Sequence, residues 1–139
     1  CEIVPGITSP VAAPAAAGIP VSHRGLAASF TVVTGHRQRG ETPVNWRALA
    51  QAGGTIVVLM GVAQRAAIAA ELIAGGLADD TPVAAVHRAT TGQQHVVRCR
   101  LADLGDTPVD SPATIVIGAV AALDVKTARG AAPAGTAPR

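Results

Sequence analysis

The chain has 139 residues, 49% of them apolar, which suits one domain with a single buried core. Its 11 Lys and Arg and 9 Asp and Glu give a net charge of +2 without a basic cluster, and with one Phe, one Trp and no Tyr it lacks aromatic platforms for bases, so nucleic-acid binding is not expected. The longest apolar runs fall short of the roughly 20 residues that span a membrane, so no membrane association is expected either.

The first elements of the chain are a strand end and a short helix. Residues 1–6 predict the end of a strand that enters a tight turn at a Pro-Gly pair. An Ala-rich helix should follow, capped by Thr8 or Ser9 and ending near Gly18. We expect Pro14 to bend or shorten this helix.

The middle of the chain alternates strands with helices. Residues 29–34 predict a strand that enters a polar loop at 36–41. Asn45 is the predicted cap of a short helix that ends before the apolar run at residues 55–60. This uninterrupted run predicts a central, buried strand.

The alternation continues to the end of the apolar sequence. Small apolar residues at helical spacing predict a helix over 63–74. Further strands are expected over 82–87, 95–101 and 113–118, the last extended by 120–123. This pattern indicates an α/β domain with roughly five strands flanked by helices.

The composition changes close to residue 124. Residues 124–139 are mostly Ala, Gly, Pro and Thr without periodicity, and such a segment buries too little apolar surface to offset its ordering entropy. We therefore expect a domain over residues 1–123 and a disordered tail or linker over 124–139.

The candidate chemical groups do not by themselves specify a reaction. The histidines show no metal-motif spacing, and structural roles are favoured for them; they are His23, His36, His87 and His95. The His23-Arg24 and His36-Arg37 pairs lie where strands meet loops, and they either present charge to an anionic substrate or are solvated loop ends. Met60, at the end of a buried strand, either lines an apolar pocket or fills the core, and the pattern alone favours the core.

The acidic residues and cysteines favour structural interpretations. Asp79-Asp80 is typical of a surface turn, and a solvated loop is expected around Asp103, Asp106 and Asp110. Cys1 and Cys99 show neither disulfide-framework nor zinc-ligand spacing, so we expect a reducing cytoplasmic location and no metal site.

A series of ordered motifs is more specific than any single residue. They are Val-Pro-Gly-Ile-Thr-Ser at 4–9, Gly-Ile-Pro-Val-Ser-His-Arg-Gly at 18–25, Val-Val-Thr-Gly-His at 32–36, Asn-Trp-Arg-Ala-Leu-Ala at 45–50, Thr-Ile-Val-Val-Leu-Met-Gly at 55–61 and Pro-Val-Ala at 82–84. In order and spacing the chain resembles the tetrapyrrole methylase family over about residues 2–123. Within that family it resembles most the members that methylate uroporphyrinogen III.

The resemblance implies the second, mixed-sheet domain of a two-domain fold that binds S-adenosyl-L-methionine between its domains. By position, Thr8 and Ser9 correspond to a loop that meets the cofactor, and Met60 to a residue that borders the adenosine. Ala89 corresponds to a backbone contact that is often Gly in relatives. The full set of implied cofactor-binding residues is Pro5, Gly6, Thr8, Ser9, Met60, Gly61, Ala89 and Thr90.

The implied reaction is two methyl transfers to uroporphyrinogen III, giving precorrin-2 for sirohaem and cobalamin synthesis and S-adenosyl-L-homocysteine as by-product. The family's catalytic groups belong to the N-terminal domain, which has no counterpart in this chain, so we assign no catalytic residue here. The family also implies a homodimer. Two alternatives stay open: another precorrin methylase, or a non-catalytic dimerisation or binding module if the natural chain starts at Cys1.

Overall fold

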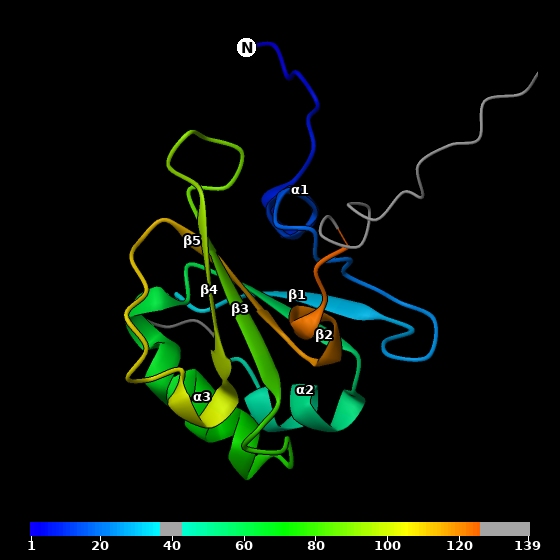
Figure 1. Cartoon of the computed structure of the whole chain (residues 1–139), viewed down its shortest axis with the longest axis vertical. Coiled ribbons are helices and arrows are strands. Elements are labelled where there is room, and N and C mark those ends of the chain that lie inside the picture. Colours follow the sequence, from blue (N-terminus) through cyan, green and yellow to red (C-terminus); the bar gives the residue numbers. More distant parts are fainter. Residues whose placement is uncertain (37–42, 126–139) are drawn as a thin grey trace, which may run out of the picture.

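The computed structural model describes residues 1–36 and 43–125, which contain a five-stranded sheet (Figure 1). The strands are β1 (Phe30–Thr34), β2 (Thr55–Leu59), β3 (Pro82–His87), β4 (His95–Arg100) and β5 (Ala113–Ile117), in the order β1-β2-β5-β3-β4. β1 and β2 are parallel, whereas β5 is antiparallel to both β2 and β3, and β4 is antiparallel to β3. The expected mixed α/β sheet is confirmed.

The inner strands are apolar along nearly their whole length because helices cover both faces of the sheet. Val57 and Val58 of β2, and Val116 of β5, have no exposed surface. The outer strands β1 and β4 instead alternate between exposed and half-buried residues. The predicted inner, buried strand is confirmed over Thr55–Leu59, although β5 occupies the centre of the sheet. Met60 is a correction: it lies outside the strand and is 63% exposed, because its φ of 51° turns the chain out of the sheet.

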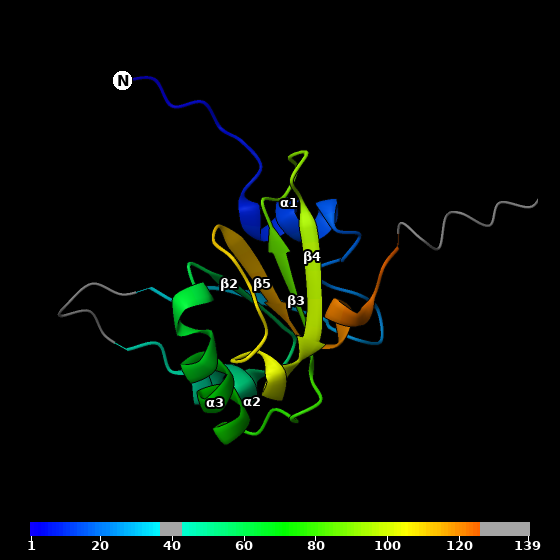
Figure 2. The same ribbon diagram turned by 60° about the vertical axis from the view of Figure 1, so that its left-hand side comes forward.

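The helices form two layers on opposite sides of the sheet (Figures 1 and 2). α1 (Ser9–Ala16) and the 3₁₀ turn η3 (Ala119–Ala122) cover one face, where Ala13 packs against Val86 and Val116. The other face is covered by α2 (Trp46–Ala52), η1 (Val62–Gln64), α3 (Arg65–Ala74) and η2 (Leu101–Asp103). The core is thus two apolar layers, not the single one expected, because the sheet buries both of its faces.

The N-terminal segment differs from the sequence prediction. Residues 1–8 form no strand, and the side chains of Ile3, Val4 and Ile7 are 80–88% exposed. This segment pairs with none of the five strands of the described sheet. Its apolar side chains are left uncovered within the described part of the chain.

Helix ends agree with the predictions at some points and differ at others. Asn45 caps α2, since its Oδ1 accepts a hydrogen bond of 3.0 Å from the Ala48 amide. Thr8 occupies the cap position of α1 without a side-chain cap, and Pro14 lies inside that helix two residues before its end. The expected helix over 63–74 is divided into η1 and α3.

The predicted extension of the last strand over 120–123 is wrong. Gly118 has a φ of 131°, which turns the chain out of β5 and into η3. Val120 and Ala121 then lie fully buried against the face that α1 covers.

Two predictions fall largely on residues outside the described ranges: the polar loop at 36–41, described only at His36, and the tail at 124–139, described only at 124–125. Over the ranges that are described, no helix has the length and apolar character needed to cross a membrane.

Candidate functional site

A hollow of about 520 Å³ lies beside α1, where the ends of β2 and β3 meet the start of β5. Because β5 is antiparallel to both neighbours, its first residues lie at the edge where β2 and β3 end. Its volume is in the range of small-molecule sites, and its lining is mainly apolar. The lining residues are Ser9, Ala13, Leu59, Met60, Val86, Arg88, Ala89, Thr91, Pro112, Ala113 and Thr114.

Three residues at this edge have left-handed backbone conformations. They are Met60, Arg88 and Thr90, with φ of 51°, 42° and 67°, and no other non-glycine residue of the described ranges has a positive φ. Such a conformation costs a residue with a side chain about 1–2 kcal/mol, and backbone outliers of this kind concentrate at ligand sites. Met60 is also 63% exposed, so its thioether is available at the mouth of the hollow.

The loop between β3 and β4 is held in place by its own polar side chains. The Thr90 amide donates to Gln94 Oε1 at 2.7 Å, and Thr91 Oγ1 donates to the Arg88 carbonyl at 2.8 Å. Gln94 Nε2 also donates to the Ala16 carbonyl at 3.1 Å, which connects the loop to the end of α1. In Figure 1 both this loop and α1 lie towards the top of the view. The two sides of the hollow are therefore joined directly.

The structure brings part of the predicted site together. Ser9, Met60 and Ala89 line the hollow. Thr90 lies in the same loop as Ala89 without lining the hollow, and Gly61 is buried behind it, where an added Cβ would lie 2.6 Å from Val58 Cγ1. The other three predicted residues belong to the exposed N-terminal segment: Pro5, Gly6 and Thr8.

Sequence reasoning missed several lining residues. Arg88 and Thr91 belong to the β3–β4 loop, Ala113 and Thr114 begin β5, and Pro112 directly precedes that strand. The strands were predictable from their apolar runs, but the insertion of β5 between β2 and β3 has no local sequence signal. That topology is what brings residues 112–114 to the hollow.

The loop that carries His23 and Arg24 forms a separate hollow lined by residues 22–28. His23 pairs with Ala27 in an isolated bridge, and its Nδ1 lies 2.8 Å from the Arg24 carbonyl oxygen. Both side chains are exposed, and among the described residues no carboxylate forms an ion pair with Arg24. His36 is exposed at the end of β1, next to the range that is not described.

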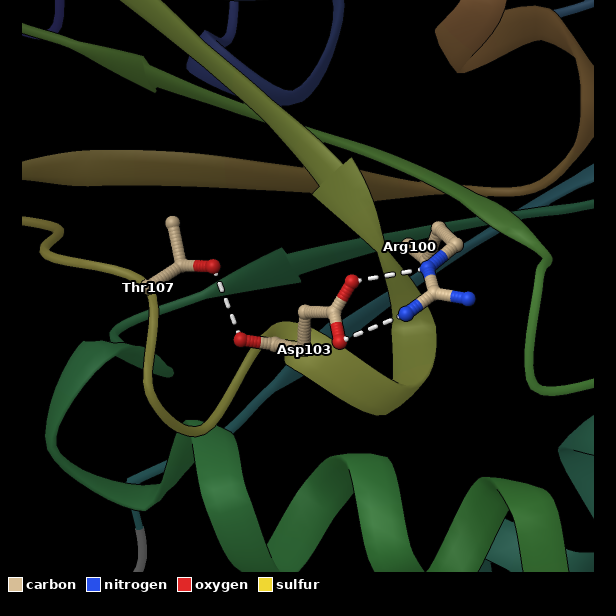
Figure 3. A network of polar contacts seen from close by, with 3 residues as sticks. All are labelled: Arg100, Asp103 and Thr107. Atoms are coloured by element: carbon tan, nitrogen blue, oxygen red, sulfur yellow. Dashed lines mark hydrogen bonds and ion pairs between the residues drawn. The ribbon is translucent and has the colours of Figure 1, made fainter.

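The acidic candidates are structural or solvent-exposed. Asp79 and Asp80 lie in an exposed turn, as predicted. Asp103 is not a free loop residue: it accepts two hydrogen bonds, of 2.8 and 3.0 Å, from Arg100, and its carbonyl accepts one from Thr107 (Figure 3). The hydrogen bonds from Arg100 lower the pKa of the Asp103 carboxyl, and Asp103 in turn raises the pKa of the guanidinium. Within 1–36 and 43–125, no group of three or more His, Cys, Asp or Glu side chains is placed to hold a metal ion.

Residues 1–105 match the family described as Tetrapyrrole (Corrin/Porphyrin) Methylases. The chain belongs to the tetrapyrrole methylase family. The resemblance in the ordered motifs is thereby confirmed.

Individual members of the tetrapyrrole methylase family are close in sequence. The chain is 47% identical over 123 residues to the uroporphyrinogen-III C-methyltransferase of Pseudomonas aeruginosa, with 86% of this chain and 50% of that protein covered. It is 44% identical over 128 residues to the S-adenosyl-L-methionine-dependent uroporphyrinogen III methyltransferase of Methanosarcina barkeri, with 88% and 50% covered. The chain spans about half the length of these relatives.

Solved structures of tetrapyrrole methylases have the same fold. Uroporphyrin-III C-methyl transferase from Thermus thermophilus, complexed with S-adenosyl homocysteine, matches with a TM-score of 0.75 and 40% identity over 86% of this chain and 52% of that one. A cobalt precorrin-4 methyltransferase matches with a TM-score of 0.76 and 30% identity, again over 86% and 52%.

Proposed function

We propose that this chain forms one wall of an S-adenosyl-L-methionine site in an enzyme that methylates uroporphyrinogen III. The observation that carries the proposal is the hollow beside α1, which joins Ser9, Met60 and Ala89, three positions that the family motifs assign to the cofactor. The similarity to two methyltransferases named for uroporphyrinogen III supports the substrate. A second domain would supply the opposite wall and the catalytic groups.

The residues of the hollow suit the adenosine part of the cofactor. The apolar side chains of Ala13, Leu59 and Val86 would contact the adenine, with Met60 closing the mouth. Left-handed backbone at Met60, Arg88 and Thr90 turns the chain sharply at the strand ends, where peptide N–H and C=O groups can meet the polar edge of a ligand. S-adenosyl-L-methionine supplies a methyl group on a sulfonium.

The substrate would lie towards the charged loops. Uroporphyrinogen III carries several carboxylates, and a guanidinium recognises a carboxylate with two parallel hydrogen bonds. Arg24 is exposed in the loop 22–28 and has no carboxylate partner among the described residues, so we assign it to one of these substrate carboxylates. Two methyl transfers would give precorrin-2 and leave S-adenosyl-L-homocysteine. We place the enzyme in the cytoplasm.

The cofactor assignment is tested by calorimetric titration with S-adenosyl-L-homocysteine. Two proteins are compared: this chain alone, and a fusion that joins the N-terminal half of the Pseudomonas aeruginosa relative to this chain. Because half of the cofactor's contacts would be absent, we expect the chain to bind weakly or not measurably and the fusion to bind tightly. Equal, tight binding by the isolated chain would contradict the half-site, and no binding by a folded fusion would contradict the cofactor wall.

A precorrin methylase is the second candidate, because a cobalt precorrin-4 methyltransferase has the same fold at 30% identity. The Gly-Ile-Pro-Val-Ser-His-Arg-Gly stretch at 18–25 favours the uroporphyrinogen III reaction. The two candidates are distinguished by incubating the fusion with labelled S-adenosyl-L-methionine and either uroporphyrinogen III or a precorrin. If the chain is a non-catalytic module, the fusion should methylate neither substrate and should bind the cofactor no more tightly than the chain alone.

We also propose that the complete enzyme is a homodimer. Phe30 and Val32 of the outermost strand β1 are 41% and 45% exposed, and among the described residues β1 has a neighbouring strand on one side alone. A second copy would cover such an edge. Sedimentation equilibrium of the fusion would give the mass of two chains.

A further inference from the structure

Two histidines face each other across the β3–β4 pair, beside the hollow. His87 is the last residue of β3, and His95, its partner across the sheet, is the first of β4. Their Nδ1 atoms lie 3.2 Å apart, and the ring centroids are 4.5 Å apart. His87 is 9% exposed, whereas His95 is open to solvent. The pair closes the base of the loop that carries Ala89.

The contacts of His87 fix where its protons can be. Its Nε2 lies 3.4 Å from the Ser111 carbonyl oxygen, which can only accept, so Nε2 carries the hydrogen. In the neutral ring Nδ1 is then an acceptor, and the hydrogen between the rings belongs to His95 Nδ1. A first proton can add to Nε2 of the exposed His95 without breaking this contact. A second proton would have to add to Nδ1 of His87. The Nδ1–H groups of two positively charged rings would then point at each other, and this repulsion would break the contact.

No charged group near the two histidines takes over the role of the contact between their Nδ1 atoms. No carboxylate among the described residues forms an ion pair with either imidazole. Asp106 and Asp110, on the segment that leads to Ser111, are exposed, and Arg88 adds a positive charge directly after His87. The remaining charged groups on elements that pack nearby are engaged elsewhere: Arg98 with the Ala121 and Leu123 carbonyls, Arg100 with Asp103, and Arg65 with the Val62 and Thr107 carbonyls.

The pair is joined to the lining of the hollow through the backbone. Val86 lines the hollow, so the next residue, His87, points to the opposite face of the sheet. His87 contacts the carbonyl of Ser111, and the amide of the following Arg88 donates to the carbonyl of Pro112 at 3.1 Å. Arg88 and Pro112 both line the hollow. The imidazoles thus support the wall from behind.

We propose that His87 and His95 are positioning residues for the cofactor wall, and that they hold it only while at most one imidazole is protonated. Histidine exchanges its proton between about pH 5 and 8, so the wall is ordered at neutral pH and loosens in acid. Only the last step, that the loosened wall binds S-adenosyl-L-methionine less tightly, rests on the proposed function.

The positioning role is tested without any cofactor by following the chain by NMR from pH 8 to pH 5. We expect the amide resonances of Arg88, Ala89 and Ala113 to shift as the pH is lowered over this range. Exchange of the Arg88 amide, normalised to that of Val116 in β5, should accelerate roughly three- to tenfold between pH 8 and pH 5. Unmoved amides with unchanged normalised exchange would overturn the proposal.

The matched variant is His95→Gln. A glutamine amide can donate to neutral His87 Nδ1 and, after rotation, accept from the protonated ring, so the contact survives at both pH values. Every other titratable group of the chain is retained. Exchange of the Arg88 amide, normalised to that of Val116, should therefore not accelerate between pH 8 and pH 5, and the wild-type acceleration in this variant would contradict the proposal.

The affinity of the fusion for S-adenosyl-L-homocysteine, measured at two pH values, tests the positioning role of the histidines and the proposed function separately. We expect the fusion to bind S-adenosyl-L-homocysteine roughly three- to tenfold more weakly at pH 5.5 than at pH 7.5, and the fusion with His95→Gln to lose this difference. Binding that is tight and independent of pH would contradict the positioning role while leaving the function intact. A fusion that binds at neither pH, with the amide response present, would contradict the function alone.

Discussion

Met60 allows binding and stability to be measured separately, because its side chain is 63% exposed and lines the hollow rather than the core. We expect Met60→Ala in the fusion to weaken S-adenosyl-L-homocysteine binding about three- to tenfold, from the loss of apolar contact. The unfolding free energy should change by less than about 0.5 kcal/mol, as for other surface substitutions.

The control for Met60 is Val125→Ala, which removes a similarly exposed apolar side chain from the segment after η3, outside the hollow. Calorimetric titration and urea unfolding of both variants give the two quantities. A loss of stability in Met60→Ala with unaltered affinity would identify Met60 as a packing residue.

Gly61 acts through packing, although it is next to Met60 in the same motif. An added Cβ would lie 2.6 Å from Val58 Cγ1 and 3.4 Å from Ile68 Cδ1, inside the layer that α3 covers. Gly61→Ala should therefore lower the unfolding free energy by about 1–3 kcal/mol. Urea unfolding checks this against Gly92→Ala, where an added Cβ meets no atom within 4 Å. Equal unfolding free energies of the two variants would contradict this packing role, because Val58 and Ile68 would then move aside without cost.

At the scale of elements, the turn η2 is fastened by the Arg100–Asp103 pair (Figure 3). Because the folded pKa of Asp103 lies below its ordinary 3.8, its contribution is present above about pH 4 and is lost as the pH falls through the folded pKa. Asp103→Asn should thus be less stable than the wild type at pH 7, and the difference should shrink at pH 3 and in high salt.

Urea unfolding at both pH values measures this difference. Asp106→Asn is the matched control, because Asp106 is exposed in the same segment and its carboxylate has no described ion pair. A difference for Asp103→Asn that stays constant between pH 7 and pH 3 would contradict the assigned pKa shift.

The elements were largely predictable, whereas their assembly was not. Runs such as Thr55–Leu59 and Ala113–Ile117 are apolar because their strands are covered on both faces, and that burial is visible in the sequence. The strand end predicted for the N-terminal segment is absent, because the segment's apolar side chains stay uncovered within the described part of the chain. The order of β2, β5 and β3 depends on long-range pairing that no local pattern records.

The candidate site follows the same division. Ser9, Met60 and Ala89 are predicted from the family motifs, and all three line the hollow; their contact with the cofactor stays a prediction. Arg88 and Thr90 adopt left-handed backbone without being glycine, so the sequence contains no signal for their conformation. Gln94 was missed because a single glutamine that fastens a loop to α1 belongs to no pattern.

At the scale of the whole molecule, the described residues leave the hollow and the apolar side chains before α1 uncovered. The chain spans about half the length of its relatives, and the hollow beside α1 is open. The exposed side chains of Ile3, Val4 and Ile7 lie immediately before α1, which borders that hollow. A second domain that docks here would cover these side chains and complete the site.

The central claim is that the hollow beside α1 is the cofactor wall. The most direct test is to follow the amide resonances of the fusion during titration with S-adenosyl-L-homocysteine. Within this chain, we expect the largest shifts on Ser9, Met60, Ala89 and Ala113. Shifts confined to the loop 22–28 or to the face covered by α2 and α3, with these four amides unmoved, would contradict the claim.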